Sequence, residues 1–214
     1  MRSYSKNNVD SVVYEYFKHR KEDIHKGIFL DIGANDGIFA NNTLLFESLG
    51  WDGVCIEGKP DLIDSLKKNR KCSCYHMVIA GDSKDTVFLE IPDQLVPGRS
   101  GLEEDITDIT LNDIKRWDLP VTKSLVHTVS FMEMYHSLFS NIKHIDLLSL
   151  DIEGSEYKVL TSINFDDITF DCIIVEPNKY EQEITNLLLR NGYKLFRKFI
   201  TKTDINWVFI QQVG

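Results

Sequence analysis

The segment Phe29–Ile38 reads as an apolar strand that runs directly into a turn marked by two glycines. Leu30 and Ile32 supply the apolar strand residues, and Gly33 and Gly37 remove side chains where a ligand would approach the backbone. A strand, such a turn and a following helix are typical of α/β proteins that bind a ligand at backbone N–H groups. The segment therefore predicts a bound ligand above this turn.

The spacing of the two glycines limits which ligand can bind. Gly33 and Gly37 do not form the G-x-G-x-x-G pattern, and the chain has no Gly-Lys-Ser/Thr phosphate loop, so a pyrophosphate ligand is disfavoured. The next predicted strand, 54–56, ends at Glu57, whose carboxylate could accept hydrogen bonds from both ribose hydroxyls of a nucleoside. Asp31 and Glu57 together also favour a cationic ligand.

Motifs along most of the chain match the pattern of one enzyme family. They are Asp31–Gly37, Asn42-Thr43, Gly50–Gly53, Ile56-Glu57, Ile145–Glu156, Ile173–Glu176 and Gly192-Tyr193. This set resembles the FkbM-type methyltransferases, which use S-adenosylmethionine. One departure is Glu57-Gly58-Lys59-Pro60, where the family usually has Glu-Pro, and a looser turn beside the ribose site is expected.

The resemblance implies a fold and an activity. The fold is the α/β class I methyltransferase Rossmann-like fold, with a seven-stranded mostly parallel sheet, an antiparallel last strand and helices on both faces. The activity is S-adenosylmethionine-dependent O-methylation of a hydroxyl, with a sugar or glycan acceptor preferred because such acceptors occur in the family. Two alternatives stay open: a nucleotide-dependent oxidoreductase on a Rossmann-like fold, and a non-catalytic binding module on the methyltransferase fold.

Apolar periodicity independently predicts strands that alternate with helices, as in a parallel sheet with right-handed crossovers. Strands are expected at 28–32, 54–56, 73–79, 86–91, 126–129, 145–150, 172–175, 193–200 and 206–210, and helices at 9–17, 45–49, 62–69 and 130–139. Ser130 and Glu133 are expected to form a capping box at the start of the last of these helices. Residues 92–120 are expected to form a long loop, and residues 201–205 a turn in the closing hairpin.

Length and composition indicate one domain over residues 1–214, because a chain with 43% hydrophobic residues and no linker or repeat can bury one core. Within it we expect an N-terminal helical cap on the cofactor side at 1–27 and a substrate lid at 92–143. The chain lacks an apolar run long enough for a membrane span, so a cytoplasmic protein is expected. The net charge of -9 argues against nucleic acid as a partner and leaves a small-molecule or glycan acceptor; the oligomeric state is open.

Three carboxylates follow later strands and are the expected catalytic residues: Asp151 and Glu153 after strand 145–150, and Glu176 after strand 172–175. Asp151 is the first choice for the acceptor of the hydroxyl proton, and Glu176 the second. Helix capping is the competing interpretation for Asp151 and Glu153, and Glu156 is expected to be a structural residue. The three could also hold a divalent cation such as Mg²⁺, but a metal is not part of the predicted site.

The remaining expectations concern the cofactor and individual side chains. The expected cofactor-binding residues are Asp31, Gly33, Ala34, Asn35, Gly37, Asn42, Thr43, Glu57, Ala80 and Asp82, of which the last two follow strand 73–79 and border the adenine unless they form a simple turn. His127 could reach the site as a base. Phe131, Tyr135 and Phe139 could stack on a sugar or pack in the core. The four cysteines are expected to be reduced and non-ligating.

Overall fold

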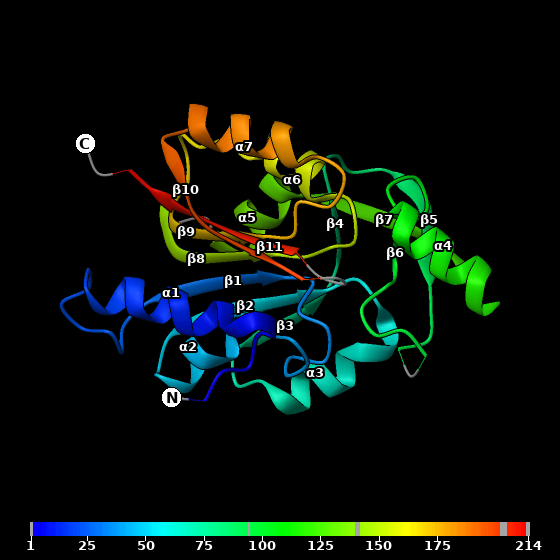
Figure 1. Cartoon of the computed structure of the whole chain (residues 1–214), viewed down its shortest axis with the longest axis horizontal. Coiled ribbons are helices and arrows are strands. Elements are labelled where there is room, and N and C mark those ends of the chain that lie inside the picture. The colour runs from blue at the N-terminus through cyan, green and yellow to red at the C-terminus, as the bar shows by residue number, and fades with distance from the viewer. Residues whose placement is uncertain (1, 94, 140–141, 202–204, 213–214) are drawn as a thin grey trace.

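The computed structural model describes residues 2–93, 95–139, 142–201 and 205–212 (Figure 1). Its central sheet has the strand order β10 (Tyr193–Ile200), β11 (Ile205–Gln211), β9 (Thr169–Val175), β8 (His144–Leu150), β1 (Ile28–Ile32), β2 (Asp52–Glu57) and β3 (Ser73–His76). From β9 to β3 all neighbours are parallel, whereas β11 is antiparallel to both β9 and β10. The expected sheet, with its antiparallel last strand, is therefore confirmed.

Helices cover both faces of this sheet (Figure 1). One face carries α1 (Val9–Lys18), α2 (Leu44–Ser48) and α3 (Ile63–Asn69), and the short 3-10 helices η1 (Lys6–Asn8) and η2 (Pro60–Leu62) precede α1 and α3. The other face carries α5 (Phe131–Phe139), α6 (Glu156–Ser162) and α7 (Glu181–Arg190). The two cores follow from the alternation of side chains along each strand, since Leu147 packs toward α1–α3 and Leu148 toward α5–α7.

A second, smaller sheet lies beside the central one (Figure 1). Its order is β4 (Val78–Ala80), β7 (Thr122–Ser130), β5 (Asp85–Glu90) and β6 (Gly101–Leu102). The single strand expected at 73–79 is wrong, because the chain leaves the central sheet at Met77, whose N–H donates to the Glu57 carbonyl, and continues as β4 against β7. As the chain passes from the central sheet to the second sheet, residues 77–79 lie beyond the end of β2.

The region 92–120 contains more regular structure than expected. It holds β6 and the ten-residue helix α4 (Asp108–Trp117), which begins where the Thr107 hydroxyl accepts a hydrogen bond of 3.1 Å from the Thr110 N–H. A threonine is a good N-cap, so this helix start is visible in the sequence in retrospect. The capping box expected at Ser130 and Glu133 is present at the start of α5.

Two further predictions concern a helix near the N-terminus and a turn near the C-terminus. The helix expected at 9–17 is α1, whose residues Val9, Val13 and Phe17 pack on the sheet face beside α2. The turn expected at 201–205 includes residues 202–204, which lie outside the described residues. Within the described part of the chain, no helix has the length and apolar character to cross a membrane.

Candidate active site

A cavity opens at the carboxyl ends of β1, β2 and β8, where the sequence places the ligand. It encloses about 1110 Å³ of empty space when its open mouth is included. The predicted site residues that line it are Asp31, Gly33, Ala34, Asn35, Asn42, Glu57, Asp151, Glu153 and Glu176. Strand ends far apart in sequence thus meet at one cavity.

The loop after β1 touches the loop after β8. Gly33 has φ +85, and a Cβ built on it would lie 1.7 Å from the carbonyl oxygen of Asp151, so only glycine fits at this position. The expectation that the N–H groups of this loop face a ligand is wrong, because those of residues 33–39 all donate within the protein. Gly33 and Ala34, for example, both donate to the Ile56 carbonyl. The N–H groups of this loop are therefore engaged within the protein, in part by β2, and are not available to a ligand.

Glu57 at the end of β2 organises this edge of the cavity. Its carboxylate accepts hydrogen bonds from the N–H groups of Asn35 (2.8 Å) and Lys59 (2.7 Å). A carboxylate has about four acceptor positions, so two hydrogen bonds leave capacity for ribose hydroxyls. Burial raises the pKa of Glu57 to about 7, against the lowering effect of these N–H groups. The turn expected to be loose is closed here by the Lys59 N–H, and the Lys59 ammonium group binds Asp93.

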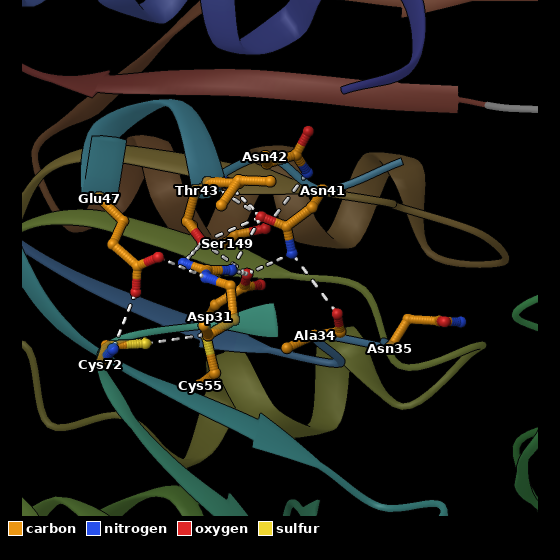
Figure 2. Close-up of polar contacts among 12 residues, drawn as sticks. Asp31, Ala34, Asn35, Asn41, Asn42, Thr43, Glu47, Cys55, Cys72 and Ser149 are labelled. Atoms are coloured by element: carbon orange, nitrogen blue, oxygen red, sulfur yellow. Dashed lines mark hydrogen bonds and ion pairs between the residues drawn. The ribbon is translucent and has the colours of Figure 1, made fainter. Parts of the chain in front are cut away.

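Asp31 at the end of β1 is held in a buried polar network (Figure 2). Its Oδ2 atom accepts hydrogen bonds from Asn41 Nδ2 (2.8 Å) and Thr43 Oγ1 (2.6 Å) and lies 3.6 Å from the Arg70 guanidinium. Arg70 also bonds Glu47 at 3.2 Å, and its side chain is fully buried. Asp31 therefore joins β1 to α2 and α3, in addition to lining the cavity.

Asp151, Glu153 and Glu176 lie close enough for their carboxylate oxygens to be within 4.8 Å of one another. Burial, and next the charge of Asp151, raise the pKa values of Glu153 and Glu176 well above their ordinary range. Arg99 lies 3.4 Å from Glu153 and opposes this rise for Glu153. Such a cluster can hold a proton at neutral pH, and it has the oxygen ligands that a hard divalent cation prefers.

The shape of this cluster depends on Glu156. The Glu156 carboxylate accepts hydrogen bonds from the N–H groups of Ile152 (2.9 Å) and Gly154 (3.0 Å) and from Asn178 Nδ2 (3.1 Å). It thereby fixes the loop after β8, in which Glu153 adopts the left-handed φ of +59. Burial, and next the charge of Asp151, raise the pKa of Glu156 to about 7.

Asp93 and residues 97–102 line one side of the cavity, whereas α4 does not line it. The Asp93 carboxylate accepts a hydrogen bond of 3.0 Å from the Gly98 N–H, and Ser100 bonds Ile91. This folded segment places Arg99 against Glu153. Sequence reasoning missed Arg99, although it is one of only two arginines within the expected lid at 92–143.

Several predicted residues lie elsewhere. Gly37, Thr43, Ala80 and Asp82 do not line the cavity; Thr43 belongs to the Asp31 network, and Asp82 pairs with Lys84 at the surface. Met77, Val78 and Ile79 provide the apolar lining where Ala80 and Asp82 were expected.

The structure also shows where the side chains lie whose roles the sequence left undecided. His127 is exposed and pairs with Asp85 at 2.8 Å, so the idea that it reaches the site is wrong. Phe131, Tyr135 and Phe139 pack in the core, and the aromatic residues at the cavity are Phe39 and Phe88.

Solved structures with the same architecture define the class of this protein. One is a ribosomal protein L11 methylase from Lactobacillus delbrueckii subsp. bulgaricus (TM-score 0.50, 10% identity, 96% of this chain and 78% of that chain covered). Another is the N-terminal domain of human METTL16 in complex with SAH (TM-score 0.51, 12% identity, 95% and 68% covered). A third is the putative methylase HI0767 from Haemophilus influenzae (TM-score 0.50, 10% identity, 96% and 97% covered). The fold is that of the class I S-adenosylmethionine-dependent methyltransferases.

The family is shown by sequence. The model of the methyltransferase FkbM domain matches residues 31–195, and the chain belongs to this family, as its motifs predicted. It is therefore a methyltransferase whose cofactor is S-adenosylmethionine. No curated protein matches the chain significantly in sequence. The alternative of a nucleotide-dependent oxidoreductase gains no support from these matches.

Proposed function

We propose that this chain is an O-methyltransferase that methylates a hydroxyl group, with a sugar or glycan as the acceptor. The observation that carries the proposal is the cluster of Asp151, Glu153 and Glu176 at the floor of the cavity. A hydroxyl must lose its proton when it is methylated, and a carboxylate positioned beside it can accept that proton. Because their pKa values are raised, Glu153 and Glu176 are stronger proton acceptors than ordinary carboxylates once they are ionised.

The residues around the cavity fit S-adenosylmethionine in two respects. Glu57 has spare acceptor positions for ribose hydroxyls, and Met77, Val78 and Ile79 provide an apolar surface for a flat base. Asp31, Gly33, Ala34, Asn35 and Asn42 complete the proposed cofactor side. When bound, the cofactor supplies a methyl group on a positively charged sulfur, and the carboxylates of this cavity favour that charge.

The acceptor side is proposed to lie between the carboxylate cluster and residues 97–101. With the cofactor bound, Asp151 would accept the proton that the acceptor hydroxyl loses when it is methylated. Holding the oxygen in line provides most of the acceleration, and the carboxylate contributes about 10² to 10⁴ in rate. Arg99 and Glu156 hold the cluster in shape rather than touch the reacting atoms.

A sugar suits this cavity for physical reasons. Its hydroxyls can bond to the carboxylates of the cluster, and its apolar face can pack on Phe39, which is 47% exposed at the cavity. A phosphate-rich acceptor suits it poorly, because the net charge is -9 and three carboxylates line the floor. These features also support residues 92–102 as the cover of the acceptor site.

The test is methyl transfer from labelled S-adenosylmethionine to a panel of mono- and oligosaccharides, lipids, peptides and RNA. We expect incorporation into a saccharide hydroxyl, and Asp151→Asn should reduce turnover by about 10² or more while S-adenosylhomocysteine still binds. Asp85→Asn, an exposed carboxylate outside the cavity, is the control and should keep full activity. Incorporation only into RNA or peptide would contradict the acceptor. Binding of S-adenosylhomocysteine without any transfer would favour the non-catalytic module.

A further inference from the structure

Three of the four cysteines lie together away from the cavity, and Figure 2 shows two of them, Cys55 and Cys72, beside the Asp31 network. Cys55 is buried in β2, Cys74 is its direct neighbour in β3, and Cys72 precedes Cys74 by two residues. Side chains two apart on an extended chain point to the same face, so all three sulfurs face α2 and α3. Cys72 Sγ lies 3.5 Å from Cys55 Sγ, and all three sulfurs lie within 4.8 Å of one another.

This spacing is that of sulfurs around a common metal ion. Three sulfurs bound about 2.3 Å from one cation in a plane lie about 4 Å from one another. Little movement of the backbone is therefore needed to bring them to one ion. We propose that Cys55, Cys72 and Cys74 form a trigonal site for a soft, sulfur-preferring cation, with Cu(I) as the best-fitting ion.

The donor set favours Cu(I) over Zn²⁺. Zinc in structural protein sites has four ligands, whereas the group formed by the described residues offers three, all of them sulfur. A neighbouring carboxylate, Glu47, is engaged by the N–H groups of Lys71 and Cys72 and by Arg70 Nε. Three thiolates can complete the coordination of a monovalent copper ion, which has high affinity for soft ligands.

The surroundings stabilise the charge of such a site. Three thiolates with one monovalent cation carry two negative charges, and the nearby Arg70 guanidinium, which also pairs with Asp31 and Glu47, offsets part of that charge. The thiol protons leave when the cation binds.

The cluster is also accessible from outside. A surface hollow lined by Glu47, Trp51 and Lys71 reaches Cys72, and both Cys72 and Cys74 are partly exposed. The sequence suggested non-ligating thiols because a Cys-x-Cys pair alone is not a usual metal spacing. The third ligand, Cys55, comes from the neighbouring strand and is visible only in the fold.

The test is a competition titration of the reduced protein with a chromophoric Cu(I) chelator, without oxygen. Wild-type protein should bind one Cu(I), and X-ray absorption should report three sulfur ligands. Cys72→Ser and Cys74→Ser should each weaken binding at least tenfold. Cys172→Ala, which removes the buried cysteine of β9 outside the cluster, should bind like wild type. Circular dichroism and S-adenosylhomocysteine titration check that each variant is folded.

Three results would overturn the proposal. The first is a wild-type affinity for Cu(I) no higher than that of Cys74→Ser. The second is X-ray absorption of the wild-type complex with two sulfur ligands, which does not depend on the folding of any variant. The third is tighter binding of Zn²⁺ than of Cu(I) in parallel titrations. Because these measurements use neither methyl donor nor acceptor, they are independent of the proposed methylation.

Discussion

The fully buried guanidinium of Arg70 lies 3.6 Å from the carboxylate of Asp31. This pair connects the end of β1 to the end of α3 beneath the loop that carries Gly33, and Glu47 adds a second carboxylate at 3.2 Å from Arg70. Removing one member of a buried ion pair leaves the other charge uncompensated, which is costly. Asp31 therefore has a structural role as well as the proposed role at the cofactor.

The first prediction is that Asp31→Asn destabilises the fold. We expect a loss of about 3 kcal/mol, at the low end for a broken buried pair because Glu47 still pairs with Arg70. Urea unfolding measures it. Asp64→Asn, an exposed carboxylate in the first turn of α3, is the control and should change stability by less than about 0.5 kcal/mol. Equal effects of the two substitutions would show that the Asp31–Arg70 pair contributes nothing specific.

The second prediction concerns Glu57→Gln. The glutamine side chain keeps one acceptor oxygen. Its NH₂ group would face the N–H of either Asn35 or Lys59, and it cannot accept a hydrogen bond from a ribose hydroxyl. We expect the Kd for S-adenosylhomocysteine to rise at least tenfold, or about 1.4 kcal/mol. Calorimetric titration measures it, with Asp52→Asn at the exposed start of the same strand as the control. An unchanged Kd would remove Glu57 from the proposed cofactor site.

The third prediction separates backbone strain from close approach at two glycines. Gly33 and Gly192 have nearly the same φ, +85 and +83, but a Cβ meets the Asp151 carbonyl at Gly33 and nothing within 4 Å at Gly192. Gly192→Ala should cost about 1–2 kcal/mol from strain alone. Gly33→Ala should cost clearly more, or prevent folding, because the two cavity loops must separate. Similar stabilities in urea would mean that the loops move apart at little cost.

Much of the fold could be predicted from the sequence because it rests on local patterns. The strand at 28–32 matches β1, and the capping box at Ser130 is present as expected. The break between β3 and β4 could not be predicted, because residues 73–79 are uniformly compatible with a strand and only their partners differ. Pairing with β7 rather than β2 is a tertiary choice.

In the candidate site, too, some residues could be predicted from the sequence and others depend on tertiary contacts. Carboxylates directly after strands, such as Asp151 and Glu176, were expected to meet because parallel strands end at one edge, and they do. Arg99 was missed because its contact with Glu153 depends on how residues 92–102 fold, which has no periodic signal. Glu156 was identified only as structural, and its three hydrogen bonds to the loop after β8 and Asn178 explain why.

The fourth prediction is a pH dependence of stability. Burial raises the pKa of Glu156 from 4.5 to about 7, so the folded protein holds this proton more tightly than the unfolded chain. The contribution of Glu156 to stability is therefore complete below pH 4.5 and is lost as the pH rises through 7. A change of this size corresponds to about 3 kcal/mol.

Urea unfolding at pH 5 and pH 8 tests this prediction. The wild-type cofactor-free protein should be more stable at pH 5, and Glu156→Gln should reduce the difference because glutamine does not ionise. Glu133→Gln is the control, since Glu133 is exposed and its pKa is lowered by hydrogen bonds from Ser130 rather than raised. A variant Glu156→Gln with the full wild-type difference would assign the pH dependence to other groups.

The fifth prediction links Arg99 to the proposed chemistry. The charge of Arg99 lowers the pKa of Glu153 against the larger raising effects of burial and Asp151. Arg99→Gln removes this opposition, so Glu153 stays protonated to a higher pH. The acid limb of the kcat/KM profile for methyl transfer should therefore move to higher pH, with little change in the affinity for S-adenosylhomocysteine.

Arg116→Gln, in the exposed helix α4, is the matched control for this experiment, because it removes the same charge without contact to the cluster. The shift must appear in Arg99→Gln and not in Arg116→Gln, since a general loss of positive charge would act on both. If Arg99→Gln lowers kcat equally at every pH, Arg99 acts by shaping residues 92–102 over the cavity. In that case the ionisation of Glu153 does not limit turnover, and proton transfer rests on Asp151 or Glu176.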